Sequence, residues 1–173
     1  MYTDLKKEWL RRLRSDEYKQ GTARLCGIET TGDEEVKRFC CLGVATDMAA
    51  EEGVVRWDET RRKETEVGIE QLPVVAPGSS MPETGLLNKE VMNYMGIPES
   101  NPSLKLGDIF RVLENRYTQD EILDKLDWSE SEREAYDYLS EYPVPSEYPV
   151  PLAKLNDSGF TFEEIADVIE ELL

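Results

Sequence analysis

Two apolar stripes at helical spacing, one at each end of the chain, constrain the fold most strongly. Within residues 4–15 the apolar side chains fall at i, i+4, i+5 and i+8, and they are Leu5, Trp9, Leu10 and Leu13. The segment from residue 161 to the C-terminus repeats the pattern with Ile165, Ala166, Val168, Ile169 and Leu172. A helix with such an apolar stripe must bury it against another element, so we expect the two terminal helices to pack into one core.

Between these ends the sequence pattern predicts several short helices and a few short strands. Helices are expected over 39–51, 86–95, 108–117, 118–126 and 129–139. Strands are expected over 23–28, 54–57 and 65–67, the last two as a hairpin, and residues 30–35 are expected to form a polar loop. We therefore predict an α+β, α-rich fold. It is a compact single domain, 1–173, with a small β-hairpin or short sheet and several short helices.

Helix starts are marked by capping boxes, in which a Ser or Thr is followed three residues later by Glu. The pairs are Thr118 with Glu121, Ser129 with Glu132, and Thr161 with Glu164. Two other segments, 58–85 and 140–151, are expected to be loop or extended insertions. The second holds an exact tandem repeat, SEYPVP-SEYPVP, whose alternate prolines block helix and central strand. It is either a spacer near polyproline II or a docking segment for an aromatic groove.

A glycine inside the expected helix 39–51 indicates a close contact. Gly43 costs about 1 kcal/mol relative to alanine in a helix interior. Such a glycine usually allows another backbone or an aromatic ring to approach closely. Gly43 is therefore expected to mark a tight packing point of the core.

The cysteines do not predict a disulfide framework. There are three, Cys26, Cys40 and Cys41, and the adjacent pair cannot form a relaxed disulfide because neighbouring Cα atoms are too close. A CxxC metal pair is absent from the sequence. We expect buried, reduced thiols and a reducing, cytoplasmic compartment.

The sequence contains no histidine, which removes several classes of chemistry. Ser-His-Asp and Cys-His machinery and nearly all catalytic zinc sites require that residue. We predict no catalytic residues, no metal site and no cofactor, although carboxylates with a Lys or Tyr could still perform acid–base chemistry. No apolar run approaches the ~18 residues of a membrane span, and the charged start does not resemble a secretory signal.

Negative charge is concentrated towards the C-terminus. The net charge is −17, and residues 114–173 hold seventeen Asp or Glu against four Lys or Arg. Direct nucleic-acid binding is not expected, because phosphate contacts require a basic surface. The acidity is interpreted as a solubilising surface, a docking patch for a basic partner, or adaptation to salt. For the docking patch, the candidate residues on expected helices are Glu121, Asp124, Glu132 and Asp137.

A polar trio follows the first helix and is a candidate ligand site. Arg14, Tyr18 and Gln20 could hold a phosphate or carboxylate, with the arginine binding in a bidentate manner. Alternatively, they tie the first helix to segment 39–51 through buried hydrogen bonds. Asp47 lies in that segment and needs a cation if buried, so Arg14 or Arg24 is the expected partner.

A second polar group precedes the last helix. Asn156 and Asp157 form either a loop directed at a ligand or a turn, with Gly159 accepting positive φ. No calcium-loop spacing and no glycine-rich phosphate loop occur in the sequence. These two residues complete the set of ligand-binding candidates.

Three blocks resemble a group of small phage and prophage proteins. They are W-x3-LRS-x2-Y-x-QG from Trp9, CCLGV from Cys40, and LND-x-G-x2-F-x-EIA from Leu155. The resemblance covers residues 1–57 and 152–173. It implies a phage accessory protein in the cytoplasm of an infected bacterium, where counter-defence by binding is one role.

These observations favour a non-catalytic binding function. The first hypothesis is an acidic protein that inhibits a host factor by docking on its basic surface. The second is a protein that sequesters a small anionic ligand such as a signalling nucleotide, and the third is a carboxylate-dependent enzyme. The sequence leaves the oligomeric state open.

Overall fold

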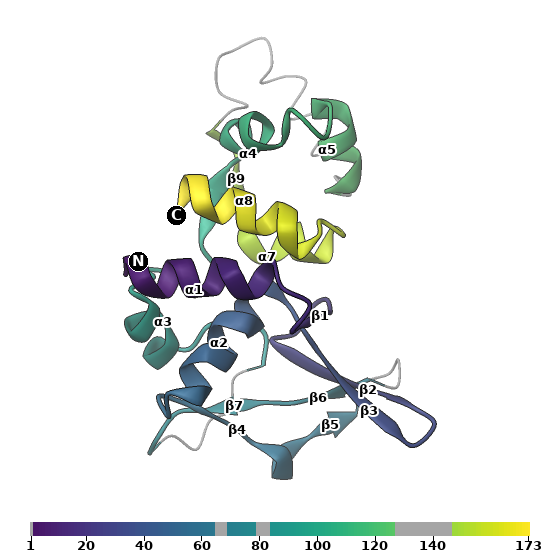
Figure 1. Ribbon diagram of the computed structural model, residues 1–173, viewed down its shortest axis with the longest axis vertical. Coiled ribbons are helices and arrows are strands. Elements are labelled where there is room, and N and C mark those ends of the chain that lie inside the picture. The colour runs from purple at the N-terminus through teal and green to yellow at the C-terminus, as the bar shows by residue number, and fades with distance from the viewer. Residues whose placement is uncertain (1, 65–68, 79–83, 127–146) are drawn as a thin grey trace.

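The computed structural model describes residues 2–64, 69–78, 84–126 and 147–173, and within them the fold is α+β, as the sequence predicts. The α-helices of these ranges are α1 (Thr3–Leu13), α2 (Cys41–Glu51), α3 (Lys89–Met95), α4 (Leu106–Leu113), α5 (Gln119–Lys125), α7 (Leu152–Asp157) and α8 (Phe162–Leu172). The helices α1, α7 and α8 form a middle layer, with α4 and α5 at one end and α2, α3 and most strands at the other (Figure 1).

The strands are short and form three small sheets. They are β1 (Lys19–Gln20), β2 (Cys26–Thr31), β3 (Glu34–Phe39), β4 (Arg56–Trp57), β5 (Lys63–Glu64), β6 (Glu70–Gln71), β7 (Val74–Val75), β8 (Ser103–Lys105) and β9 (Pro149–Pro151). The largest sheet has the order β1-β3-β2-β6-β5, in which β1 and β3 are parallel and the other pairs antiparallel. The other two sheets pair β4 with β7 and β8 with β9.

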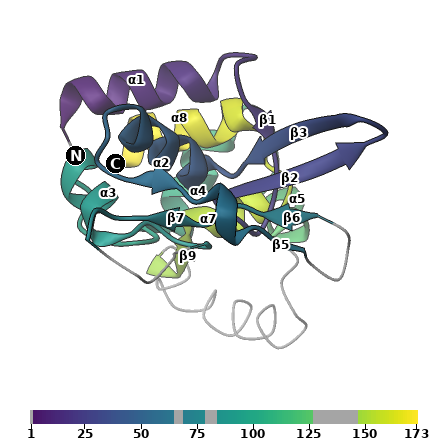
Figure 2. The same cartoon turned by 90° about the horizontal axis from the view of Figure 1, so that it is seen from below.

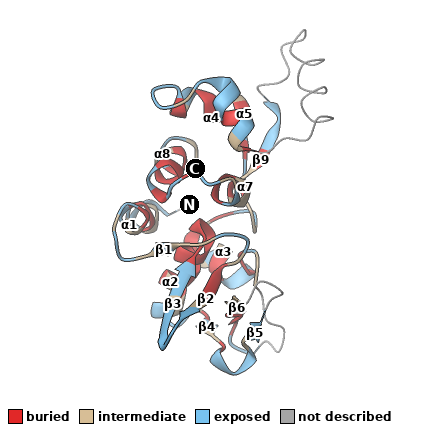
Figure 3. Cartoon of the chain, turned by 90° about the vertical axis from the view of Figure 1, so that its right-hand side faces the viewer, coloured by how far each residue is buried: buried red, intermediate tan, exposed pale blue. Residues whose placement is uncertain are grey.

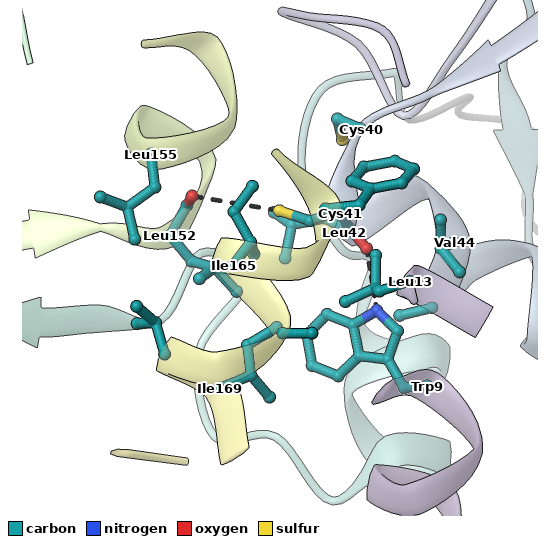
Figure 4. Packing of buried hydrophobic residues seen from close by; sticks show 14 of the residues in the cluster. Trp9, Leu13, Cys40, Cys41, Leu42, Val44, Leu152, Leu155, Ile165 and Ile169 are labelled. Atoms are coloured by element: carbon teal, nitrogen blue, oxygen red, sulfur yellow. Dashed lines mark hydrogen bonds between the residues drawn. The ribbon is translucent and has the colours of Figure 1, made fainter. Parts of the chain in front are cut away.

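The two terminal helices share one core, which confirms the expected packing. Trp9 is fully buried on α1, and its indole Nε1 donates a 3.0 Å hydrogen bond to the carbonyl oxygen of Cys41. Figure 4 shows Ile165 and Ile169 of α8 close to this indole ring. The apolar stripes therefore meet over the start of α2, and this contact joins both ends of the sequence.

Gly43 permits the close approach that the sequence predicts. A β-carbon at this position would overlap the carbonyl oxygen of Leu25 and lie 2.6 Å from its carbonyl carbon. The backbone just before β2 therefore rests directly on α2. Cys40 is the N-cap of this helix, and its sulfur accepts a hydrogen bond from the Gly43 amide at 3.3 Å.

Two of the three predicted capping boxes lie in the described ranges, and both are present. Thr118 and Glu121 open α5, and Thr161 and Glu164 open α8, with each side chain bonding the other's backbone amide. Residues 129–139, where the third box was expected, lie outside the described residues.

The expectation of a polar loop at 30–35 is wrong. Strands β2 and β3 form a hairpin across this segment, with Thr31 opposite Glu34. Gly32 has a φ of +66° at the first turn position, which is typical of a type II′ turn. The hairpin projects from the body of the molecule (Figure 2), and β3 is exposed along much of its length (Figure 3).

Pairing across the middle of the chain also differs from the prediction. Strand β4 pairs with β7, with Arg56 opposite Val75, and the expected partner at 65–67 lies outside the described residues. The range 58–85 was expected to be an insertion, yet it contributes β5, β6 and β7, and Leu72 and Val74 are fully buried. The range expected to be an insertion therefore also supplies residues of the core.

The end of the tandem repeat is extended, as its prolines predict. Residues 149–151 form β9, which pairs antiparallel with β8 and buries Val150. The first copy and the start of the second, 140–146, lie outside the described residues. For its last three residues the second copy is therefore part of the packed fold.

Candidate functional site

Asp47 and Tyr18 belong to a polar cluster at the junction of α1, α2 and β4. The Asp47 carboxylate accepts hydrogen bonds from the Tyr18 hydroxyl at 2.8 Å and from the Trp57 Nε1 at 2.7 Å. Arg12 donates to the Tyr18 oxygen at 2.9 Å. Burial, followed by the bond to Asp47, raises the pKa of Tyr18 above its ordinary value. This hydroxyl therefore stays protonated and serves as a donor.

Arg14 lies apart from that cluster, so the expected pairing of Asp47 with Arg14 or Arg24 is wrong. The Arg14 guanidinium instead contacts Asp167 at 2.8 Å and Glu170 at 2.5 Å, both on α8. Asp47 is compensated by two neutral donors and by Arg12 beyond Tyr18.

Gln20 and Asn156 form a second polar cluster, which joins the N-terminal and C-terminal blocks. Asn156 is fully buried, accepts from the Cys41 amide at 3.1 Å and donates to the Gly21 carbonyl at 2.7 Å. Gln20 donates to the Phe160 carbonyl at 2.7 Å and accepts from the Phe162 amide at 3.0 Å. These side chains hold the turn before α8 against the strand β1.

Asp157 is exposed but has a structural contact as well. One carboxylate oxygen accepts from the Ala23 amide at 2.7 Å. The six candidates Arg14, Tyr18, Gln20, Asp47, Asn156 and Asp157 are thus not gathered around one ligand site. Of the trio, Tyr18 alone makes the expected contact with segment 39–51, through Asp47, whereas Arg14 and Gln20 contact the C-terminal block.

A concentration of carboxylates surrounds a hollow between α4 and α8. A groove of about 400 Å³ is lined by Arg111, Val112, Glu114, Asp167, Glu170 and Glu171, and we call it the acidic groove. Both helices run side by side near the C-terminus (Figure 1). Their inner faces are apolar, with Ile109 and Ile169 fully buried, so the charged side chains remain at the rim.

The carboxylates of the acidic groove differ in how they are paired. Asp167 contacts Arg14 at 2.8 Å and Arg116 at 2.7 Å, and Glu170 contacts Arg14. Glu114 and Glu171 are exposed and make no ion pair with any residue of the described ranges. These two carboxylates keep the groove negative.

The docking residues expected from sequence lie elsewhere. Glu121 and Asp124 are exposed on α5, and the Glu121 carboxylate accepts from the Thr118 amide at 2.7 Å in the capping box. Glu132 and Asp137 lie outside the described residues. Sequence reasoning missed the groove residues, whose only signal was the acidic C-terminal composition.

The three thiols are buried and reduced, as expected. Burial raises the pKa of Cys40 to about 11 and that of Cys26 to about 12, and it raises the pKa of Cys41 well above the usual thiol value. The described ranges bring no group of three or more potential ligands among Cys, Asp and Glu into an arrangement that could hold a metal ion.

Because the three thiols are buried and their pKa values are raised, we expect slow labelling of the native protein. At pH 8 a disulfide reagent such as DTNB should label the three cysteines rapidly in urea and far more slowly in the folded chain, because the thiolate is the reactive form. Rapid release of chromophore from the folded chain would contradict this account.

The raised thiol pKa values also predict how stability depends on pH. Unfolding restores the lower thiol pKa, so the free energy of unfolding should fall as the pH rises above about 9.

Comparison with known protein families places the whole chain in one family. Residues 1–173 match the model of a domain of unknown function, DUF8296, and the chain belongs to that family. It matches none of the curated proteins and none of the solved structures with which it was compared. Among the described helices, none has the length and apolar character needed to cross a membrane.

Proposed function

We propose that this protein acts by binding, and that its acidic groove docks on the basic surface of a macromolecular partner. The observation that carries the proposal is the hollow of about 400 Å³ between α4 and α8, where four carboxylates face one arginine. A lysine or arginine side chain of the partner would enter this groove and exchange water for charge-assisted hydrogen bonds.

The charge around the groove supports rapid and selective encounter. Residues 114–173 carry seventeen acids against four basic residues, so the groove lies within the most negative third of the chain. Such a field speeds association with a basic surface and repels nucleic acid. Glu114 and Glu171 contribute most directly, because internal arginines do not neutralise them.

The resemblance to phage and prophage proteins gives the partner a class. Under this proposal the partner is a host defence protein with a basic surface, for instance one that otherwise holds nucleic acid. The protein would then inhibit by occupying that surface, with no covalent chemistry.

The test compares two double variants of equal charge change against a fluorescent oligolysine peptide. We expect Glu114→Lys with Glu171→Lys to weaken binding at low salt at least about tenfold, or about 1.4 kcal/mol. The matched control is Glu52→Lys with Glu99→Lys, which alters two exposed acids on other elements that make no ion pair within the described ranges. Fluorescence anisotropy measures both affinities, and circular dichroism checks the fold.

Salt provides the second arm of this experiment. The Debye length shrinks from ~10 Å at 0.1 M to ~3 Å at 1 M, so the difference between the variants should narrow at high salt. Equal weakening by both double variants would show that the peptide responds to net charge alone. The acidity would then serve solubility, and the acidic groove would not be a docking site.

A further inference from the structure

A second hollow, on a different part of the molecule, is lined by cations. This cavity has a volume of about 370 Å³ and lies between the segment before β2, the start of α2, the loops around α3, and α7. Its lining includes Arg24, Lys154, Asn101, Cys40 and Asp157, together with a partly apolar wall of Leu86, Pro151 and Ala153. We call it the Arg24 cavity.

Hydrogen bonds between its walls hold the Arg24 cavity open. The Leu25 amide donates to the Thr84 carbonyl at 2.9 Å, and the Ala153 amide donates to the Asn101 side-chain oxygen at 3.0 Å. The Ala23 amide donates to Asp157 at 2.7 Å. These contacts cross-link segments that are far apart in sequence, so the cavity exists before any ligand enters.

The backbone that presents Arg24 is strained. Ala23 has a φ of +61°, and it is the one non-glycine residue of the described ranges with a positive φ. Such a conformation costs on the order of 1–3 kcal/mol and persists when its surroundings enforce it, often at ligand sites. Here the contact with Asp157 enforces it and fixes the position from which the next residue, Arg24, reaches the cavity.

The two cations of the cavity have no side-chain partner within the described residues. Among the described arginines, Arg24 and Arg56 are the two that make no ion pair with the part of the chain that the structure describes, and Arg56 does not line this cavity. Lys154 makes no hydrogen bond or ion pair through its side chain with the described residues. The Asp157 carboxylate faces the same space but is engaged by the Ala23 amide and by Asn156.

We propose that the Arg24 cavity binds a small organic phosphate, with Arg24 and Lys154 on the phosphate and the apolar wall on the organic body. A guanidinium fork matches phosphate oxygens in a bidentate manner, and lysine adds a point charge. The amide of Asn101 supplies a further donor at the wall. A volume of about 370 Å³ lies at the lower end of the ligand-pocket range, which favours a compact ligand.

The experiment titrates the full chain with three probes by isothermal calorimetry. Phenyl phosphate should bind saturably and more tightly than inorganic phosphate, while phenol should show no binding, because the anion anchors the ligand and the wall adds affinity. Arg24→Gln should weaken phenyl phosphate binding at least about tenfold, or about 1.4 kcal/mol. The matched control, Arg56→Gln, should bind as the unchanged protein does, and melting temperatures report folding.

Lys154→Gln is the second variant, and it should also weaken phenyl phosphate binding. It keeps the proposal testable if Arg24→Gln fails to fold. Absence of saturable phenyl phosphate binding would overturn the proposal, as would equal losses in Arg24→Gln and Arg56→Gln. Inorganic phosphate binding as tightly as phenyl phosphate would overturn the assignment of an organic ligand. The acidic-groove variants Glu114→Lys and Glu171→Lys should leave phenyl phosphate binding intact, so the two proposals fail independently.

Discussion

Replacing Gly43 with alanine should destabilise the chain by at least about 3 kcal/mol, the largest effect we expect from adding one carbon. Overpacking a core usually costs about 1–3 kcal/mol, and more when the obstacle cannot rotate away. Here the obstacle is backbone, because the new β-carbon would overlap the Leu25 carbonyl group. Helix α2 and the segment before β2 would have to separate, and the walls of the Arg24 cavity would separate with them.

Urea unfolding followed by circular dichroism measures this loss. The matched control is Gly85→Ala, where a β-carbon meets nothing within 4 Å and φ is not positive. That variant should stay within about 0.5 kcal/mol of the unchanged protein. A Gly43→Ala protein as stable as the Gly85→Ala control would mean that Leu25 does not rest on α2.

Replacing Trp9 with alanine should cost about 3–5 kcal/mol, the usual range for a fully buried tryptophan. The indole has no exposed surface, and its Nε1 donates a hydrogen bond to the Cys41 carbonyl oxygen. The variant therefore leaves a cavity between the terminal helices and removes the hydrogen bond that the Cys41 carbonyl accepts from the indole, in addition to its bond within α2. A change below about 1 kcal/mol would show that the terminal blocks do not depend on this ring.

Two further variants separate the contributions at Trp9. Trp9→Phe retains much of the packing and removes the hydrogen bond, so it should fall between the unchanged protein and Trp9→Ala. Tyr2→Ala is the control, since Tyr2 precedes the same helix and is 61 % exposed. Its cost should stay within about 0.5 kcal/mol.

Local signals in the sequence predicted the helical part of the fold well. A capping box depends on residues three apart, so Thr118–Glu121 and Thr161–Glu164 were visible without tertiary knowledge. The stripe that contains Trp9 likewise follows from helical periodicity alone. The special role of Gly43 was also predicted, although the identity of the approaching group, Leu25, was not.

Strand pairing was predicted poorly, for physical reasons. Strand β3 is charged and largely exposed on both faces, so it lacks the alternation that marks a half-buried strand. Its turn, Gly32–Asp33, resembles an ordinary polar loop in composition. The pairing of Arg56 with Val75 joins two-residue strands across a long connection, and no local pattern encodes such a contact.

The candidate sites depended on pairing that only the fold reveals. Negative charge at the C-terminus was evident, but which carboxylates stay unpaired depends on Arg14 reaching across to α8. The sequence suggests Arg14 or Arg24 as the partner of Asp47, yet Tyr18 and Trp57 are the residues that donate to it. The sequence gives one indication for Lys154, which is the single basic residue within the acidic segment 152–173.

The most direct test of the binding function is an amide chemical-shift titration of the isotope-labelled chain with unlabelled oligolysine at low salt. The account predicts saturable shifts concentrated on α4 and α8 around Glu114 and Glu171, which weaken as salt is added. Uniform small shifts at exposed acids throughout the chain, or no saturable shifts at all, would contradict it.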